Sequence, residues 1–112
     1  MADLPLGNEG VLNGGTPVTA LGAPASSKQR QVPANGASVY NADSVSHTIK
    51  WQKKKASTAY VIYIETGVVA GALSILGKKV VLDATDETLE VVMEGAHTTL
   101  APTYDVAAME TS

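Results

Sequence analysis

The fold class is decided by residues 46–65, which read SHTIKWQKKKASTAYVIYIE. In the first half of this stretch, His47, Ile49 and Trp51 fall on one side of an extended chain and polar residues fall on the other. A period of two residues is typical of a strand that buries one face. The sequence therefore predicts a strand over residues 46–53, followed by a polar hairpin tip at residues 53–57.

The second half of the stretch predicts the partner strand, from Thr58 to Glu65. Thr, Tyr, Val and Ile dominate it, and these residue types favour strands. Strict alternation places Tyr60, Ile62 and Ile64 on one face of this strand. Apolar residues also occupy the opposite face, so we expect the strand to be covered on both sides.

Outward from this hairpin, the chain shows more short strands separated by turn signals. They are predicted at residues 28–32, 37–41, 72–76, 79–82, 88–94 and 104–109. Turn signals recur roughly every 8–12 residues, which is the spacing of a sandwich or barrel. No segment carries a helical stripe three turns long. The sequence predicts an all-β fold, a small antiparallel β-sandwich or Greek-key barrel.

The first 27 residues have a different composition. They hold five of the ten glycines and three of the five prolines, and their only charges are Asp3 and Glu9. We predict an extended N-terminal arm at residues 1–27 and a sandwich domain at residues 28–112. A purely solvated tail has no use for apolar side chains, so those of the arm are predicted to bind a partner: Leu4, Leu6, Val11, Leu12, Val18 and Leu21.

The charges are separated along the chain, although the formal net charge is only -3. All eight Lys and Arg residues lie between residues 28 and 79, and residues 80–112 carry seven acids and no base. Opposite blocks can pair between neighbouring strands or between copies of the chain. Cysteine is absent, so no disulfide is expected. No signal peptide and no membrane-spanning segment are predicted.

Catalytic residues are not expected. Asp43, Ser44, Ser46 and His47 include the residue types of a hydrolytic triad, but they are nearly contiguous. A working triad requires three side chains that converge from separate elements. A turn that leads into a strand explains these residues better, so the sequence does not indicate an enzyme.

Metal and cofactor sites are not expected either. His47 and His97 could share a metal, but no further ligand spacing accompanies them. Asp83, Asp86 and Glu87 could hold Ca²⁺, yet they lack the spacing of an EF-hand loop. An acidic turn is the better interpretation of this second cluster.

Two further binding hypotheses remain open. Lys53, Lys54 and Lys55, near Trp51 and Tyr60, resemble a small phosphate-binding patch, but the isoelectric point of about 5.2 argues against nucleic acid. Alternatively, Trp51, Tyr60 and Tyr63 could stack on a carbohydrate, with alternation placing Trp51 in the core.

Three segments carry a recognisable pattern of strands and turns: Ser38–Ile49, which reads as strand, polar turn and alternating strand, then Val80–Val91, and finally Tyr104–Glu110. Together they resemble small virion proteins of tailed double-stranded DNA phages. The resemblance covers about residues 28–112. It implies a β-sandwich structural protein of the virion, and it carries no catalytic or ligand-binding residues with it.

This resemblance implies a capsid decoration (cement) protein on the outer surface of the virion. Its expected partners are the major capsid protein and other copies of itself in a homotrimer, without membrane or nucleic acid. The arm would then hold the protein onto the shell. A neck, tail or fibre-base protein is the alternative within the virion, and a carbohydrate-binding attachment module is the alternative outside this class.

Overall fold

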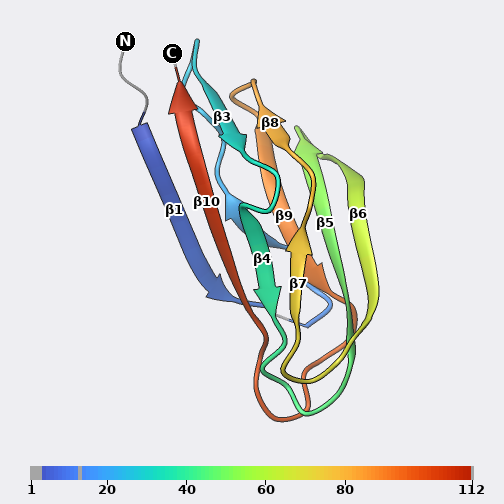
Figure 1. Cartoon of the computed structure of the whole chain (residues 1–112). Coiled ribbons are helices and arrows are strands. Elements are labelled where there is room, and N and C mark those ends of the chain that lie inside the picture. Colours follow the sequence, from blue (N-terminus) through green and yellow to red (C-terminus); the bar gives the residue numbers. More distant parts are fainter. Residues whose placement is uncertain (1–3, 13, 112) are drawn as a thin grey trace.

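The computed structural model describes residues 4–12 and 14–111, and these residues form strands, turns and loops without a helix (Figure 1). The all-β prediction is therefore confirmed. The strands are β1 (Leu4–Val11), β2 (Val18–Leu21), β3 (Gln29–Val32), β4 (Ala37–Tyr40), β5 (His47–Lys55), β6 (Thr58–Val68), β7 (Leu73–Leu76), β8 (Val80–Leu82), β9 (Glu87–Met93) and β10 (Thr103–Thr111).

The strands form two antiparallel sheets. In the first sheet, β10 pairs with β1 on one side and with both β3 and β4 on the other. β8 then pairs with β3, and β7 pairs with β4. The second sheet has the order β2-β9-β5-β6. If β3 with β4 and β7 with β8 are each counted as one interrupted strand, the order is that of an eight-stranded jelly roll.

The interruption between β3 and β4 comes from the Pro33–Gly36 segment. Five residues separate Gln31 from Ala37, whereas only two separate their partners on β10. Gly36 donates its N–H to the carbonyl of Pro33 at 2.9 Å, and Asn35 has a φ of 67°. The Pro33–Gly36 segment is thus a bulge in a longer strand that runs along β10.

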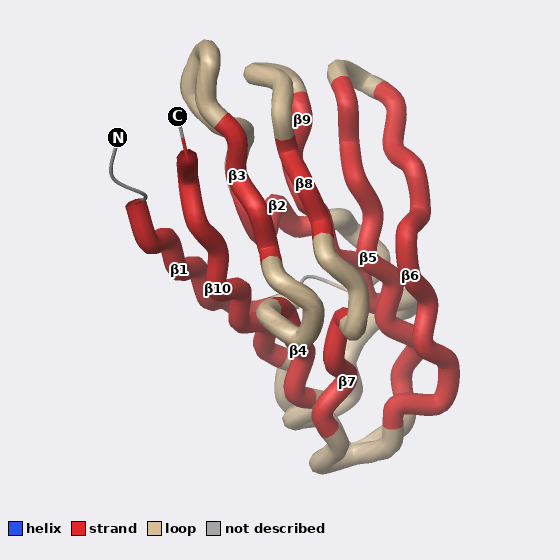
Figure 2. Tube along the Cα trace, turned by 45° about the horizontal axis from the view of Figure 1, so that its top comes forward, coloured by secondary structure: helices blue, strands red, loops and turns tan. Residues whose placement is uncertain are grey.

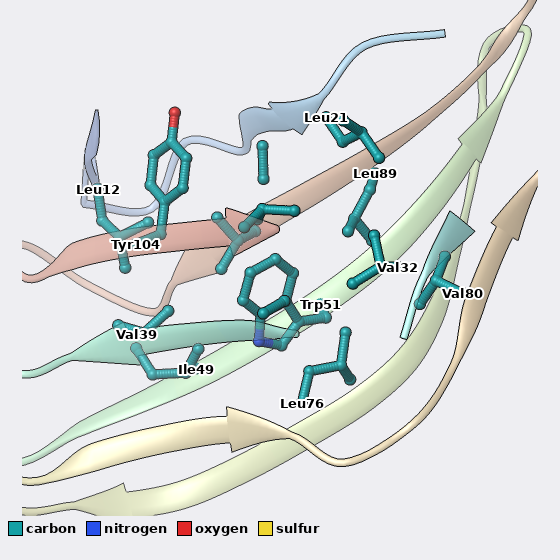
Figure 3. Packing of buried hydrophobic residues seen from close by; sticks show 14 of the residues in the cluster. Leu12, Leu21, Val32, Val39, Ile49, Trp51, Leu76, Val80, Leu89 and Tyr104 are labelled. Carbon is teal, nitrogen blue, oxygen red and sulfur yellow. The ribbon is translucent and has the colours of Figure 1, made fainter. Parts of the chain in front are cut away.

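The core lies between the sheets, and the alternating residues of the central strands build it (Figure 3). Ile49 and Trp51 are fully buried on β5, as are Leu89, Val91 and Met93 on β9. The inward face predicted for β5 is therefore confirmed. Trp51 is the largest fully buried side chain among the described residues.

The prediction of an N-terminal arm outside the sandwich is wrong for the residues that the structure describes. β1 pairs with β10 over its whole length, from Leu4 opposite Glu110 to Val11 opposite Thr103. β2 is an edge strand of the second sheet, paired with β9. Residues 1–3 and 13 lie outside the described residues. The described part of the first 27 residues thus supplies β1 to the first sheet and β2 to the second.

Two glycines of this segment allow close approach rather than an irregular path. A Cβ on Gly10 would lie 2.7 Å from the hydroxyl of Tyr104, and a Cβ on Gly14 would lie 2.5 Å from the carbonyl oxygen of Gly95. Both distances are far below van der Waals contact. These glycines let β1 and the following loop pack against residues far along the chain.

The face predicted for β6 also needs a correction. The register between β5 and β6 shifts between Trp51 and Gln52, so that Ile62 is an extra residue on β6. Beyond this bulge, Tyr63 pairs with the buried Trp51, while Ile64 pairs with Lys50 and is exposed. Tyr60 and Ile64 consequently lie on opposite faces, because a bulge reverses the alternation.

Candidate functional site

A buried polar cluster joins three loops at one end of the sandwich. Asn41 and Asp43 follow β4, and both side chains are buried. Asn41 donates its amide to the carbonyls of Val45 at 2.9 Å and Val68 at 2.8 Å. Asp43 accepts the N–H groups of Thr98 at 2.8 Å and Thr99 at 2.7 Å. The loops 41–46, 69–72 and 94–102 are therefore held together at this end.

Asp43 and His47 were singled out from the sequence, and the structure brings them together. The Nε2 atom of His47 lies 2.5 Å from Oδ2 of Asp43. Burial alone raises the pKa of Asp43, but hydrogen bonds from His47, Thr99, Thr98 and Ser44 outweigh it and hold this pKa well below its usual range. The hydroxyl of Thr99 also donates to the carboxylate, at 3.0 Å.

This constellation is structural rather than catalytic in its geometry. The carboxylate is saturated with donors from its own loops. Ser44 contributes its backbone N–H to Asp43, and Ser46 is exposed. In a hydrolytic triad, by contrast, a nucleophilic hydroxyl hydrogen-bonds the histidine. What the cluster does is fix the conformation of the three loops.

The acidic turn at residues 83–87 is likewise organised by internal bonds. Glu87 is buried; it accepts the N–H of Asp83 at 3.0 Å and lies 3.2 Å from the Lys53 ammonium. Within residues 4–12 and 14–111, no three His, Asp or Glu side chains gather as a metal site requires. Neither the turn nor the pair of His47 and His97 forms a metal centre among these residues.

Glu87 should make the stability of the protein pH-dependent. Burial raises its pKa, but hydrogen bonds with Asp83 and the ion pair with Lys53 outweigh burial and lower the pKa from 4.5 to about 2. A lowered folded-state pKa gives stability that is present above pH 4.5 and is lost as the pH falls toward 2. We expect Glu87→Gln to flatten the acid branch of a urea-unfolding series.

The matched control for this prediction is Glu94→Gln. Glu94 is exposed and its carboxylate lies 4.0 Å from Lys50, so its loss should change the pH profile less. Equal pH profiles for wild type and Glu87→Gln would contradict the assignment.

The three aromatic candidates do not come together on one exposed surface. Trp51 is fully buried, so it offers no stacking face. Tyr60 is exposed beside a hollow that Lys53, Lys55 and Glu87 also line. The three consecutive lysines belong to β5 instead of forming the hairpin tip, which is the Ala56–Ser57 turn. A sugar platform of three aromatic residues is thus not formed.

Sequence reasoning missed an apolar surface at the end of the sandwich that the Asp43 cluster organises. Each of the three loops exposes one aliphatic side chain: Val45 is 42 % exposed, Val69 57 % and Leu100 61 %. Figure 1 shows these loops together at the lower end, below β4, β5 and β7. The signal in the sequence was an aliphatic residue inside each predicted loop.

This surface continues onto the outer face of the first sheet. The register aligns Val11 with Thr103, Thr103 with Tyr40, and Tyr40 with Leu73 in one row across the strands. Val11, Tyr40 and Leu73 are all exposed large hydrophobic residues. We call the six residues together the apolar end: Val11, Tyr40, Val45, Val69, Leu73 and Leu100.

The six residues of the predicted arm that were expected to bind a partner lie in different environments. Leu12 and Leu21 are buried in the core, and Leu6 and Val18 pack partly against it. Val11 is exposed and belongs to the apolar end. The side chain of Leu4 lies outside the described part of the chain. Leu12 and Leu21 have no surface left for a partner, because their own sandwich covers them.

No family model and no curated protein matches the sequence. None of the described residues forms a helix long and apolar enough to cross a membrane.

Proposed function

We propose that this protein is a structural component of a tailed-phage virion that decorates the capsid shell and attaches through its apolar end. The observation that carries the proposal is the apolar end itself. Monomeric soluble proteins rarely gather exposed aliphatic side chains in this way unless a partner covers them. The partner is the major capsid protein, and the location is the capsid surface.

The Asp43 cluster suits the apolar end to binding. It fixes all three loops before any partner arrives, so little conformational entropy is lost when the surface docks. The charges of the three loops also limit the kinds of partner that can bind. The loops 41–46, 69–72 and 94–102 contain no Lys or Arg, so the surface lacks the cations that attract phosphates or anionic lipids. An apolar protein surface is the partner that fits.

The architecture supports the same class of protein. Jelly rolls occur in viral capsid proteins, and also in lectins and cupins. Because a fold by itself does not specify function, the surface must discriminate between them. A cupin-like metal site is not assembled within the described residues, and Trp51 is not available to a sugar. The structural role in a virion remains the best supported.

A neck, tail or fibre-base position is the second candidate. The separation of charge along the chain gives this position no separate support, because the basic and acidic blocks pair within the fold, Arg30 with Glu110 and Lys53 with Glu87. Stoichiometry distinguishes the two positions. A decoration protein should be present in purified virions in numbers comparable to the major capsid protein, and a neck or tail component in only a few copies.

Charged substitutions at the apolar end test the attachment. We expect Val69→Asp and Leu100→Asp each to weaken binding to shells assembled without this protein by about tenfold or more, because a carboxylate must be desolvated in the contact. Co-sedimentation with such shells measures the loss.

Met109→Asp is the matched control for this experiment. Met109 is an exposed apolar residue on β10, near the end of the sandwich opposite the three loops. Undiminished binding of both apolar-end variants would refute attachment through this surface. Absence of the protein from purified virions would refute the proposed function as a whole.

A further inference from the structure

The free edge of β6 is a second surface that the fold leaves without a partner. The two sheets have four edges: β1 and the β7/β8 strand border the first sheet, and β2 and β6 border the second. Figure 2 shows β6 at the rim, with no strand beyond it. An edge strand presents a row of unpaired N–H and C=O groups that can pair with another strand.

Three of these edges carry devices that discourage pairing. β1 contains Pro5, which lacks a donor, together with Gly7 and the charged Glu9. β2 is only four residues long and its register is irregular. β7 and β8 have four and three residues, and the exposed Lys78 and Lys79 interrupt them. Short strands, charges and proline are the usual protections of an edge.

β6 has almost none of these protections. It is eleven residues long, the longest strand of the described chain. Residues 58–64 read TAYVIYI, without charge, proline or glycine. Tyr60, Val61 and Ile64 are each about half exposed, and they lie on both faces of the strand. Its register with β5 shifts twice, at the bulge at Ile62 and again between Glu65 and Val68. Such a segment is an aggregation hazard unless something covers it.

We propose that β6 pairs with β6 of a second copy of this chain, antiparallel about a two-fold axis. A second copy offers a matching partner. Its other three edges are protected against pairing, whereas its own β6 presents unpaired N–H and C=O groups and no charge along residues 58–64. No like charges would oppose each other along residues 58–64. The two second sheets would merge into one sheet of eight strands.

This contact is isologous, so it closes at two copies. It therefore differs from the homotrimer that the sequence resemblance implies. It lies away from the apolar end, and it does not depend on the proposed function. A dimer in solution is expected even where no capsid shell is present.

Cysteine scanning tests the contact directly, because the chain has no native cysteine. Single cysteines along residues 59–64 should form an intermolecular disulfide most readily nearest the two-fold axis. Cα atoms of a non-hydrogen-bonded antiparallel pair lie about 4.5 Å apart, within the range of a disulfide. Oxidation followed by non-reducing electrophoresis locates this maximum, and Met109→Cys should not form the crosslink.

Charged variants provide the matching equilibrium measurement. Val61→Lys and Ile64→Lys each place two ammonium groups in the symmetric contact, so dimerisation should weaken by about tenfold or more. Sedimentation equilibrium over a concentration series measures it, with Met109→Lys as the control and circular dichroism as the check on folding. A monomeric wild type, or oligomers that persist in both β6 variants without a β6 crosslink, would overturn the proposal.

Discussion

A chain that begins at residue 28 will not fold into the two-sheet sandwich. Its far-ultraviolet circular dichroism should lack the strand signal of the full chain, and its urea titration should show no cooperative transition. The reason is that the truncation removes two strands and part of the core, although the composition of residues 1–27 suggests a dispensable tail. β10 would lose its β1 partner along eight residue pairs, and β9 would become an edge.

The size of the effect follows from the core residues that are lost. Leu12, Ala20 and Leu21 are all buried in the hydrophobic cluster. Truncating one core leucine to alanine costs about 2–5 kcal/mol. A domain of this size has a total stability of roughly 5–15 kcal/mol. Loss of two leucines together with a strand ladder is therefore expected to exceed what the remaining fold can supply.

The control for the truncation is Val11→Ser in the full chain. Val11 is exposed at the end of β1, so this substitution should leave the unfolding midpoint nearly unchanged. A truncated protein that unfolds cooperatively, with a midpoint close to that of the full chain, would contradict the structure. It would return residues 1–27 to the role of a separate arm.

The strands that the sequence predicted correctly are those in which burial alone imposes the pattern. On β5, β9 and β10 one face meets the opposite sheet, so apolar residues recur at every second position. Trp51, Val91 and Val106 illustrate this, since all three are essentially fully buried. No knowledge of the partner strand was needed to place them.

β1 could not be predicted in this way, because its conformation is imposed from outside. Pro5, Gly7 and Gly10 have low strand propensity, but β10 supplies a complete template for the backbone. Tertiary pairing overrides local preference at such positions. Gly10 is present because the Tyr104 ring occupies the space of its missing side chain. Glycines in a sequence do not by themselves distinguish close packing from a flexible backbone.

The bulge on β6 and the apolar end escaped prediction for a related reason. Both depend on which segments meet in space. One extra residue at Ile62 moves Ile64 to the opposite face, and nothing in the local sequence marks that residue. Val45, Val69 and Leu100 come from three loops, and they belong to one surface only because Asn41 and Asp43 bind those loops together.

Replacement of Asp43 should be among the most destabilising single changes in this protein. Asp43→Ala would remove the buried carboxylate that pairs with the N–H groups of Ser44, Thr98 and Thr99 and with the Nε2 atom of His47. Unpaired buried donors are costly, since water no longer compensates them. We expect the Tm to fall by about 10 °C or more. Asp43→Asn should be intermediate, because an amide keeps one acceptor oxygen and loses the charge.

Hydrogen exchange distinguishes loss of this cluster from a general loss of stability. The amides of Thr98 and Thr99 should lose protection in Asp43→Asn, while those in the centre of β5 and β9 stay protected at temperatures below the transition. The control is Asp105→Asn, because Asp105 is an exposed acid on β10. It should change neither the Tm nor the protection of the Thr98 and Thr99 amides. An unchanged Tm with Thr98 and Thr99 still protected would contradict the assignment. Because the same carboxylate holds the loop that carries Leu100, the variant should also bind its partner more weakly than its remaining stability alone would suggest.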